Sequence, residues 1–271
     1  MTAGPAASLR PGPDAEPMLE IRDLSFTYAG DIKPTVDHLS LTIHKGEFVC
    51  LIGPSGCGKS TIFRLVNKLL NPESGSISVD GRDISGRKNY CGYMPQQDLL
   101  FPWRTVAENV RLPLEIKGGM DQNDMDKAVN DALKNVGLED WGNKSPSELS
   151  GGMRQRAAFA RTILTGCDLL LLDEPFSALD YLTRLSLREW LLKQWEREHK
   201  TILFITHDVE EAVFLSNRVL AVTGFPISEL KSVEIPAGYP RDISSLSEPG
   251  MARIKEELID MLRREAPTDE K

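Results

Sequence analysis

The stretch Phe48-Val49-Cys50-Leu51-Ile52-Gly53-Pro54-Ser55-Gly56-Cys57-Gly58-Lys59-Ser60-Thr61 decides the fold of this chain. Its apolar first part predicts a buried strand, and the segment after it has apolar residues at helical spacing, at Ile62, Leu65, Val66, Leu69 and Leu70. Between the two, the glycine-rich segment predicts a loop whose backbone N–H groups turn toward an anion at a helix N-terminus. Lys59 can reach the outer phosphates of a nucleoside triphosphate, and the Ser60 hydroxyl can ligate Mg²⁺. The alternative is a tight strand-to-helix turn that binds nothing.

Composition describes an ordinary globular protein of 271 residues, with 41% apolar and 27% charged residues. Its net charge of -8 and pI of about 5.2 argue against a nucleic-acid partner that is bound by phosphate neutralisation. We find no apolar run long enough to span a bilayer and no apolar core of a signal peptide near the start, so we expect a cytoplasmic chain. The four cysteines lack C-x-x-C spacing, which supports neither a metal site nor a disulfide framework.

The N-terminal part is expected to build an antiparallel sheet. Residues 1–17 are rich in Ala, Pro and Gly and are predicted to be a disordered leader. Apolar and polar residues then alternate over 18–28 and 36–43, as in half-buried strands. A further strand over 75–79 and the turn Asp80-Gly81 fit the same sheet.

The middle of the chain is expected to be helical. Thr105 and Glu108 have capping-box spacing and predict a short helix that stops near Pro113. A longer helix is indicated by an apolar face that Gly137 can cap, formed by Met125, Val129, Leu133 and Val136. The small residues Ser150, Gly151 and Gly152 then precede an Ala-rich helix, and such an end lets a phosphate approach closely.

Two carboxylates, Asp173 and Glu174, follow the apolar run Leu169–Leu172, which predicts a buried parallel strand. Ligands bind at the carboxyl ends of such strands. Asp173 could hold Mg²⁺ together with Ser60, and Glu174 could polarise an attacking water. A helix over 181–199 and a strand over 201–205 would bring His207 to the same edge. The alternatives are a solvated strand end for the carboxylates and a hydrogen-bonded strand-end histidine.

After a helix over 208–216 and a strand over 218–222, the chain is expected to form a loop-rich tail. An amphipathic helix closes the tail, with Ile254, Leu258, Met261 and Leu262 on one face.

From Met18 to Gly224 the sequence resembles the ATP-binding cassette of ABC transporters. The resemblance is carried by Gly53–Thr61, Gln96, Leu149-Ser150-Gly151-Gly152-Met153-Arg154-Gln155, Leu169–Glu174, Ser177-Ala178-Leu179-Asp180 and His207. It implies an α/β fold: a P-loop NTPase (RecA-like) core over 18–96 and 150–224 with an antiparallel β subdomain, a helical subdomain over 97–149, and a tail over 225–271.

The resemblance also implies a head-to-tail dimer, either a homodimer or a pair with another ATPase subunit. Two ATP molecules would each lie between one phosphate loop and the Ser150-Gly151-Gly152 segment of the other subunit. It assigns further roles by similarity: Tyr28 to adenine stacking, Gln96 to Mg²⁺ and water, Asp180 to the dimer interface and His207 to the γ-phosphate. Tyr28 has core or surface packing as its alternative. Pro95 stands where relatives commonly have an aromatic residue and a second glutamine follows, so spacing favours Gln96 and Gln97 is the alternative.

The resemblance implies the ATPase subunit of an importer at the cytoplasmic face of the membrane, bound peripherally to separate permease subunits and only indirectly linked to a solute-binding protein. Asp98–Trp103 offers apolar residues that a permease helix could cover, with a locally packed loop as the alternative. Leu100–Trp103 and Tyr239–Asp242 are similar to the nitrate, sulfonate and taurine branch of importers. The alternative function is a soluble ABC-type ATPase that acts as an assembly factor without a permease.

Overall fold

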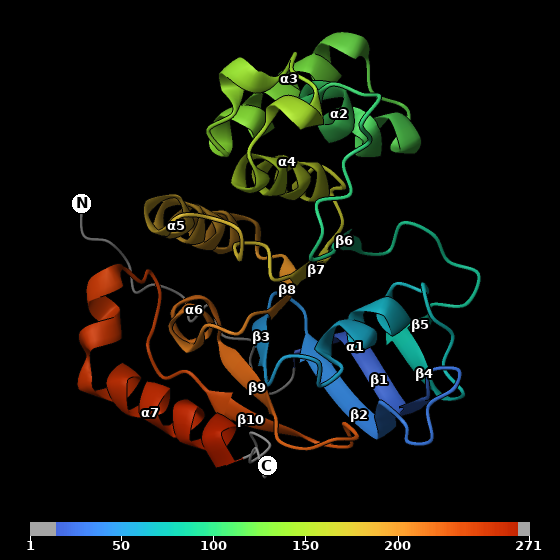
Figure 1. The fold of residues 1–271 in the computed structure, drawn as a ribbon, viewed down its shortest axis with the longest axis vertical. Coiled ribbons are helices and arrows are strands. Elements are labelled where there is room, and N and C mark those ends of the chain that lie inside the picture. Colours follow the sequence, from blue (N-terminus) through green and yellow to red (C-terminus); the bar gives the residue numbers. More distant parts are fainter. Residues whose placement is uncertain (1–14, 265–271) are drawn as a thin grey trace. The chain divides into compact units, whose positions relative to one another are not determined.

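The computed structural model of the chain describes residues 15–264, and Figure 1 shows its fold. The described residues divide into two compact units, one of 15–88 with 192–264 and one of 89–191. The division falls inside helix α5 (Tyr181–Glu198). The predicted helical subdomain, 97–149, lies within the second unit, and the predicted domain boundaries stay predictions. Within residues 15–264 no helix combines the length and apolarity needed to cross a membrane.

An antiparallel sheet forms the N-terminal part of the first unit, in the order β2-β1-β4-β5. Its strands are β1 (Pro17–Phe26), β2 (Val36–His44), β4 (Ser74–Val79) and β5 (Arg82–Asp83). The predicted alternation is confirmed, because Ile21 pairs with Leu41 on one side and Ile77 on the other, and all three side chains are buried. Asp80 and Gly81 both have positive φ, the backbone that a two-residue hairpin turn requires.

The predicted leader, residues 1–17, overlaps strand β1, because β1 begins at Pro17. Pro17 opens β1 opposite His44. Glu16 accepts from the Lys45 ammonium at 2.7 Å, and the Ala15 carbonyl lies 2.8 Å from His44 Nδ1. These contacts fix the chain just upstream of the strand. The remainder of the predicted leader, residues 1–14, lies outside the described residues.

A second sheet of the first unit runs in the order β10-β9-β3-β8. Its strands are β3 (Phe48–Ile52), β8 (Thr201–Ile205), β9 (Arg218–Val222) and β10 (Leu230–Glu234). The parallel strands β3 and β8 are buried along their whole length, as their apolar sequences predict. Strand β10 escapes sequence prediction because only Val233 of it is buried, which leaves no alternating pattern to detect.

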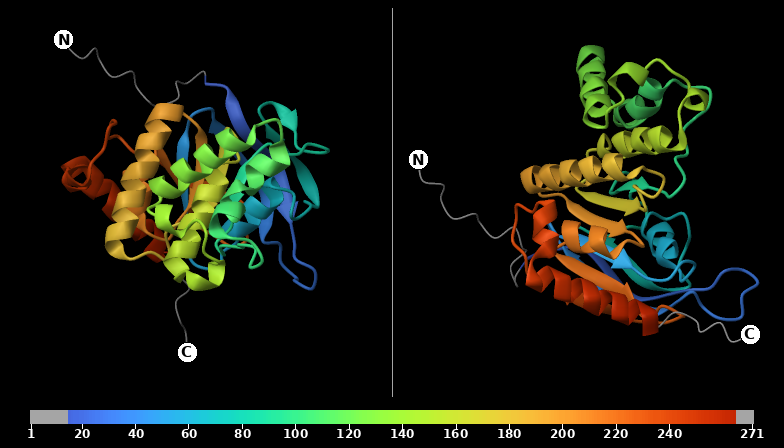
Figure 2. Two further views of the ribbon diagram at one scale, coloured as in Figure 1. Left: turned by 90° about the horizontal axis from the view of Figure 1, so that it is seen from above. Right: turned by 60° about the vertical axis from the view of Figure 1, so that its left-hand side comes forward.

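The helices of the first unit are α1 (Lys59–Val66), α6 (Val209–Leu215), the 3₁₀ turn η3 (Ile243–Ser247) and α7 (Pro249–Arg264). Helix α6 packs on β3 and β9, and α7 packs on α6, as the views of Figure 2 show. The predicted amphipathic face of α7 is present, with Leu258 fully buried.

Helix α1 is shorter than its apolar spacing predicts. It ends at Val66, Lys68 adopts a φ of 61°, and Leu69 is 66% exposed. The amides of Leu69 and Leu70 both donate to the Arg64 carbonyl, which closes the helix end. The apolar residues at 69 and 70 are therefore not part of the helical face.

In the second unit, β6 (Gly92–Met94) pairs in parallel with β7 (Leu169–Asp173). Its helices are α2 (Val106–Lys117), α3 (Gln122–Asn135), η1 (Glu139–Trp141), η2 (Pro146–Glu148) and α4 (Gly151–Ile163). Helices α2, α3 and α4 pack against one another. Gly137 follows α3 with a φ of 64°, which confirms the predicted cap.

Pro113 does not stop α2, contrary to the sequence prediction. The Thr105 capping box forms as predicted, but the helix continues to Lys117. Val106, Val110 and Leu114 recur every fourth residue on one buried face. Because Leu114 lies beyond the proline, burial of this face favours a continuous helix even though Pro113 has no N–H to donate.

Candidate functional site

Two positions of the phosphate loop require glycine because neighbouring side chains lie too close for a Cβ atom. A Cβ on Gly53 would lie 2.8 Å from Val222 Cβ, and a Cβ on Gly58 would lie 2.6 Å from Thr35 Cγ2. Gly58 also has a φ of 105°, a conformation that side chains disfavour. The loop is therefore pressed against its own unit, and its backbone fits only glycine at these two positions.

Helix α1 begins directly at the end of this loop. Gly58 is its N-cap, no side chain of the described residues caps it by hydrogen bonding, and its first turn has no acidic residue. The helix N-terminus therefore keeps its partial positive charge available to an anion. This is the arrangement that the sequence predicted for Gly53–Thr61.

Lys59 folds back onto the loop that precedes it. Its ammonium donates to the carbonyls of Gly53 and Pro54 at 2.9 and 2.7 Å, and the residue is only 6% exposed. Since the residue is buried and its ammonium is anchored to two loop carbonyls, the charge is held against the loop instead of pointing to solvent. A phosphate bound there would meet a pre-placed cation.

Tyr28 and His207 lie near the phosphate-loop end of the first unit. The Tyr28 hydroxyl is 3.1 Å from Thr61 Oγ1, and its ring packs edge-on against Phe26. His207 follows β8, whose Ile205 is in register with Leu51 of β3. His207 and Gly53 therefore leave the sheet at the same edge, as predicted. His207 is exposed.

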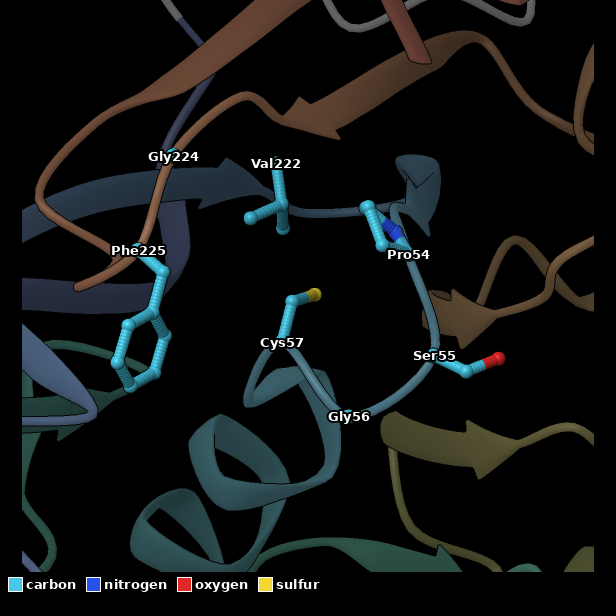
Figure 3. Close-up of a pocket in the computed structure, with 7 residues that line it drawn as sticks. All are labelled: Pro54, Ser55, Gly56, Cys57, Val222, Gly224 and Phe225. Atoms are coloured by element: carbon cyan, nitrogen blue, oxygen red, sulfur yellow. The ribbon is translucent and has the colours of Figure 1, made fainter. Parts of the chain in front are cut away.

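A pocket of about 400 Å³ lies beside the loop, and Cys57 points into it (Figure 3). It is lined by Pro54, Ser55, Gly56, Cys57, Val222, Gly224 and Phe225. Phe225 is 58% exposed, so one wall of the pocket is an open aromatic face. Within the described residues no disulfide joins the four cysteines.

In the second unit, Gln96 and Glu174 meet at the carboxyl edge of the strand pair. Met94 is in register with Leu172, and Gln96 and Glu174 each lie two positions after these paired residues. Gln96 Nε2 donates to Glu174 Oε2 at 3.2 Å; Gln96 and the predicted alternative, Gln97, are both exposed. Asp173 is 2% exposed, and Glu174 has a φ of 49°. A non-glycine residue in this left-handed region is strained, a feature that clusters at functional sites.

The residues predicted to contact ATP from the other subunit form the start of α4. The Ser150 hydroxyl accepts from the Met153 amide at 3.3 Å and so caps the helix. A Cβ on Gly152 would lie 3.1 Å from the Ala178 carbonyl, so this glycine is also needed within its own unit. Asp180 accepts from the Thr183 amide at 3.0 Å, and hydrogen bonds from Thr183 hold the pKa of its carboxyl below the ordinary value.

Sequence reasoning gave no role to Gln155, which the structure places beside Glu174. The side chain is 3% exposed and contacts the loop after β7. The signal that could have found it is a polar residue on the apolar face of α4, at helical spacing from Ala158, Phe159 and Thr162, all of which are buried.

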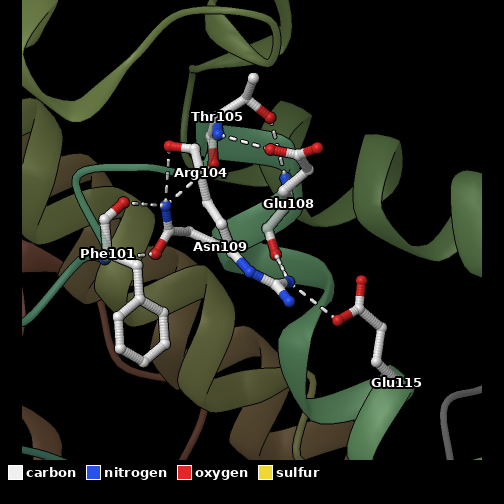
Figure 4. A network of polar contacts seen from close by, with 6 residues as sticks. All are labelled: Phe101, Arg104, Thr105, Glu108, Asn109 and Glu115. Carbon is white, nitrogen blue, oxygen red and sulfur yellow. Dashed lines mark hydrogen bonds and ion pairs between the residues drawn. The ribbon is translucent and has the colours of Figure 1, made fainter.

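The predicted docking segment Asp98–Trp103 is held from inside the second unit (Figure 4). The fully buried Asn109 accepts from the Phe101 amide at 2.7 Å and donates to the carbonyls of Phe101, Arg104 and Thr105. Leu99 and Trp103 remain 58% and 76% exposed. The loop thus presents apolar side chains from a fixed backbone.

The predicted Mg²⁺ donors are a hydroxyl, an amide and a carboxylate, from Ser60, Gln96 and Asp173. Within residues 15–264 there is no cluster of three or more His, Cys, Asp or Glu that could enclose a metal. Mg²⁺ at nucleotides typically takes one or two protein oxygens along with phosphates and water, so the donor types fit this ion.

Comparison with known proteins gives consistent matches. Residues 36–177 match the family described as "ABC transporter". The formylaminopyrimidine import ATP-binding protein ThiZ of Halalkalibacterium halodurans is 42% identical, over 84% of this chain and 88% of its own length. The aliphatic sulfonates import ATP-binding protein SsuB of Bacillus thuringiensis is also 42% identical, over 78% and 83%.

Solved structures give the same result. A dimeric post-hydrolysis state of the ATP-binding cassette MJ0796 bound to ADP and Pi superimposes with a TM-score of 0.74 and 30% identity. The match covers 81% of this chain and 100% of that one. The predicted fold class, an α/β P-loop NTPase core, is confirmed.

Proposed function

Because the chain belongs to the ABC transporter family, as an ATP-binding cassette with ATPase activity, we propose that it powers an importer by working on separate permease subunits. The relatives support this, since those named above are import ATP-binding proteins. A small solute such as a nitrate, sulfonate or taurine is the proposed cargo, and the sulfonate importer subunit favours this branch.

The residues act on ATP in separate roles. Lys59 and the loop amides hold the β- and γ-phosphates, and Tyr28 stacks on adenine. Bound Mg²⁺ would neutralise phosphate charge, with Ser60, Gln96 and Asp173 as its protein ligands. Glu174 accepts a proton from the attacking water, and Gln96 orients the same carboxylate from 3.2 Å.

Closure of the site is proposed to need a second copy or a paired ATPase subunit. Ser150, Gly151 and Gly152 would contact the γ-phosphate of ATP held by the partner, and Asp180 would lie in the interface. The dimeric state of the solved relative with ADP and Pi supports this arrangement.

The observation that carries the importer role is the docking segment Asp98–Trp103. Trp103 packs its ring on Phe101, with centroids 5.0 Å apart, while remaining 76% exposed. Phe101 is half-buried beneath this exposed ring, and the backbone of the pair is fixed by Asn109. The pair is therefore a preformed hydrophobic surface, which suits a helix of a partner protein.

The test is copurification with any permease subunits that are encoded beside this gene, after co-expression and detergent extraction. We expect the wild-type chain to copurify with the permease. The double variant Phe101→Ala, Trp103→Ala should no longer copurify, although it should still bind ATP. Ile32→Ala is the matched control, since Ile32 is 99% exposed and belongs to the other unit. Equal recovery of the double variant would reject this surface. Failure of the wild-type chain to bind any permease would favour the soluble ATPase.

A further inference from the structure

Helix α4 supports the loop that follows β7 with one of its faces. Gly152, Gln155 and Phe159 recur at helical spacing and all contact residues 174–179. The Phe159 ring packs edge-on against Phe176 at 5.7 Å, and both rings are 1% exposed. The loop is therefore anchored by an apolar contact at Phe159 and by a polar one at Gln155.

Gln155 uses both ends of its amide in this contact. Its Nε2 donates to the Glu174 carbonyl at 3.0 Å and lies 3.4 Å from Ser177 Oγ, while its Oε1 accepts from the Ala178 amide at 3.0 Å. The Glu174 carbonyl also accepts from Ser177 Oγ at 3.0 Å and from the Ser177 amide at 3.2 Å. Three donors thus converge on one carbonyl.

These donors act on the residue whose backbone is strained. Glu174 adopts a φ of 49°, which costs free energy and persists only when surrounding contacts fix it. Rotation of this peptide would redirect the Glu174 side chain, which Gln96 contacts from the other side. A buried amide held at both ends is well suited to fixing that rotation, because an unmet hydrogen bond would be costly at a site 3% exposed.

We propose that Gln155 is a positioning residue for hydrolysis, which holds the Glu174 peptide in its strained conformation so that the carboxylate faces the attacking water. The proposal rests on the proposed role of Glu174 as the base. It also links the Ser150 end of α4 to the catalytic carboxylate of the same subunit, since Gln155 lies little more than one helical turn from Ser150.

The test uses Gln155→Met, which keeps the length of the side chain and removes its hydrogen bonds. We expect the turnover number of the full-length chain to fall by about 10²-fold, as for a small misplacement of a catalytic group. The KM for ATP and the stoichiometry of ATP binding should not change, because the phosphate loop holds the nucleotide. If Gln155 only stabilised the fold, part of the Gln155→Met protein would be unable to bind ATP, and the amount of ATP bound per chain would fall.

Thr162→Val is the matched control. Thr162 is another polar residue of α4 that is 3% exposed, but its hydroxyl donates within the helix, to the Ala158 carbonyl. We expect turnover within twofold of the wild type. If both variants lose turnover equally, Gln155 acts only by stabilising α4 and the proposal is wrong.

A double-mutant cycle with Glu174→Gln, measured under single-turnover conditions, separates the two proposals. If Gln155 acts through Glu174, adding Gln155→Met to Glu174→Gln should lower the residual rate no further. Wild-type turnover in Glu174→Gln would overturn the proposed base. Loss of turnover in Glu174→Gln, with unchanged turnover in Gln155→Met, would overturn the positioning role alone.

Discussion

The loop after β3 and the loop after β7 both leave a buried parallel strand, yet different parts of the chain hold them in place. The first loop is held by a residue at its own end, because the Lys59 ammonium donates to the carbonyls of Gly53 and Pro54, which lie only a few residues earlier in the chain. The second is held by Gln155, nineteen residues earlier, and by Gln96, seventy-eight residues earlier. A locally closed loop suits binding, whereas a loop held by a helix can respond to movement of that helix.

Of the changes to the contacts that hold the two loops, Lys59→Met should have a larger effect than Ser177→Ala, and its effect should be on ATP binding. Removing the buried charge that is proposed to meet phosphate should cost roughly 2–5 kcal/mol of binding free energy, which is an affinity loss of about 30-fold or more. The unfolding midpoint should change little, because the loop keeps its glycines. Titration of the variant with ATP gives the affinity, and Lys68→Met, which changes an exposed lysine after α1, is the control. Unchanged affinity would show that the loop does not rely on its lysine.

Ser177→Ala should have a smaller effect than Lys59→Met, and its effect should be on the turnover number. The hydroxyl is one of three donors to the Glu174 carbonyl, and losing one hydrogen bond of about 0.5–1.5 kcal/mol predicts a roughly 2- to 10-fold lower turnover number. Steady-state hydrolysis at saturating ATP measures it. Ser186→Ala is the control, since this serine is also exposed and donates to Leu182 within α5. A changed KM with normal turnover would contradict the distinction between the two loops.

This difference also explains what could be predicted from the sequence. The strand, glycine-rich loop and helix around Gly53–Thr61 are predictable from the sequence because their signals act over a few positions, whereas phosphate binding by this loop stays a prediction. The strand β7 and the carboxylates Asp173 and Glu174 were predictable because an apolar run marks a buried parallel strand.

The errors have physical causes of their own. Pro113 was expected to end α2, but packing of Leu114 outweighed the lost hydrogen bond. Leu69 and Leu70 had the right spacing for α1, but backbone closure at Arg64 ended it. Gln155 stands in a motif that carries the family resemblance, but the sequence gives it no role because its partners Glu174 and Ala178 lie on another element and single-sequence patterns do not show pairing in space.

The most direct test of the account is ATP hydrolysis by Glu174→Gln, measured beside ATP binding on the same protein. The substitution keeps the shape and the contact with Gln96 but removes the proton acceptor. We predict that turnover falls by roughly 10²- to 10⁴-fold while ATP binding persists. Hydrolysis at the wild-type rate would contradict the assignment of Glu174 as the base and with it the catalytic role of the β7 loop.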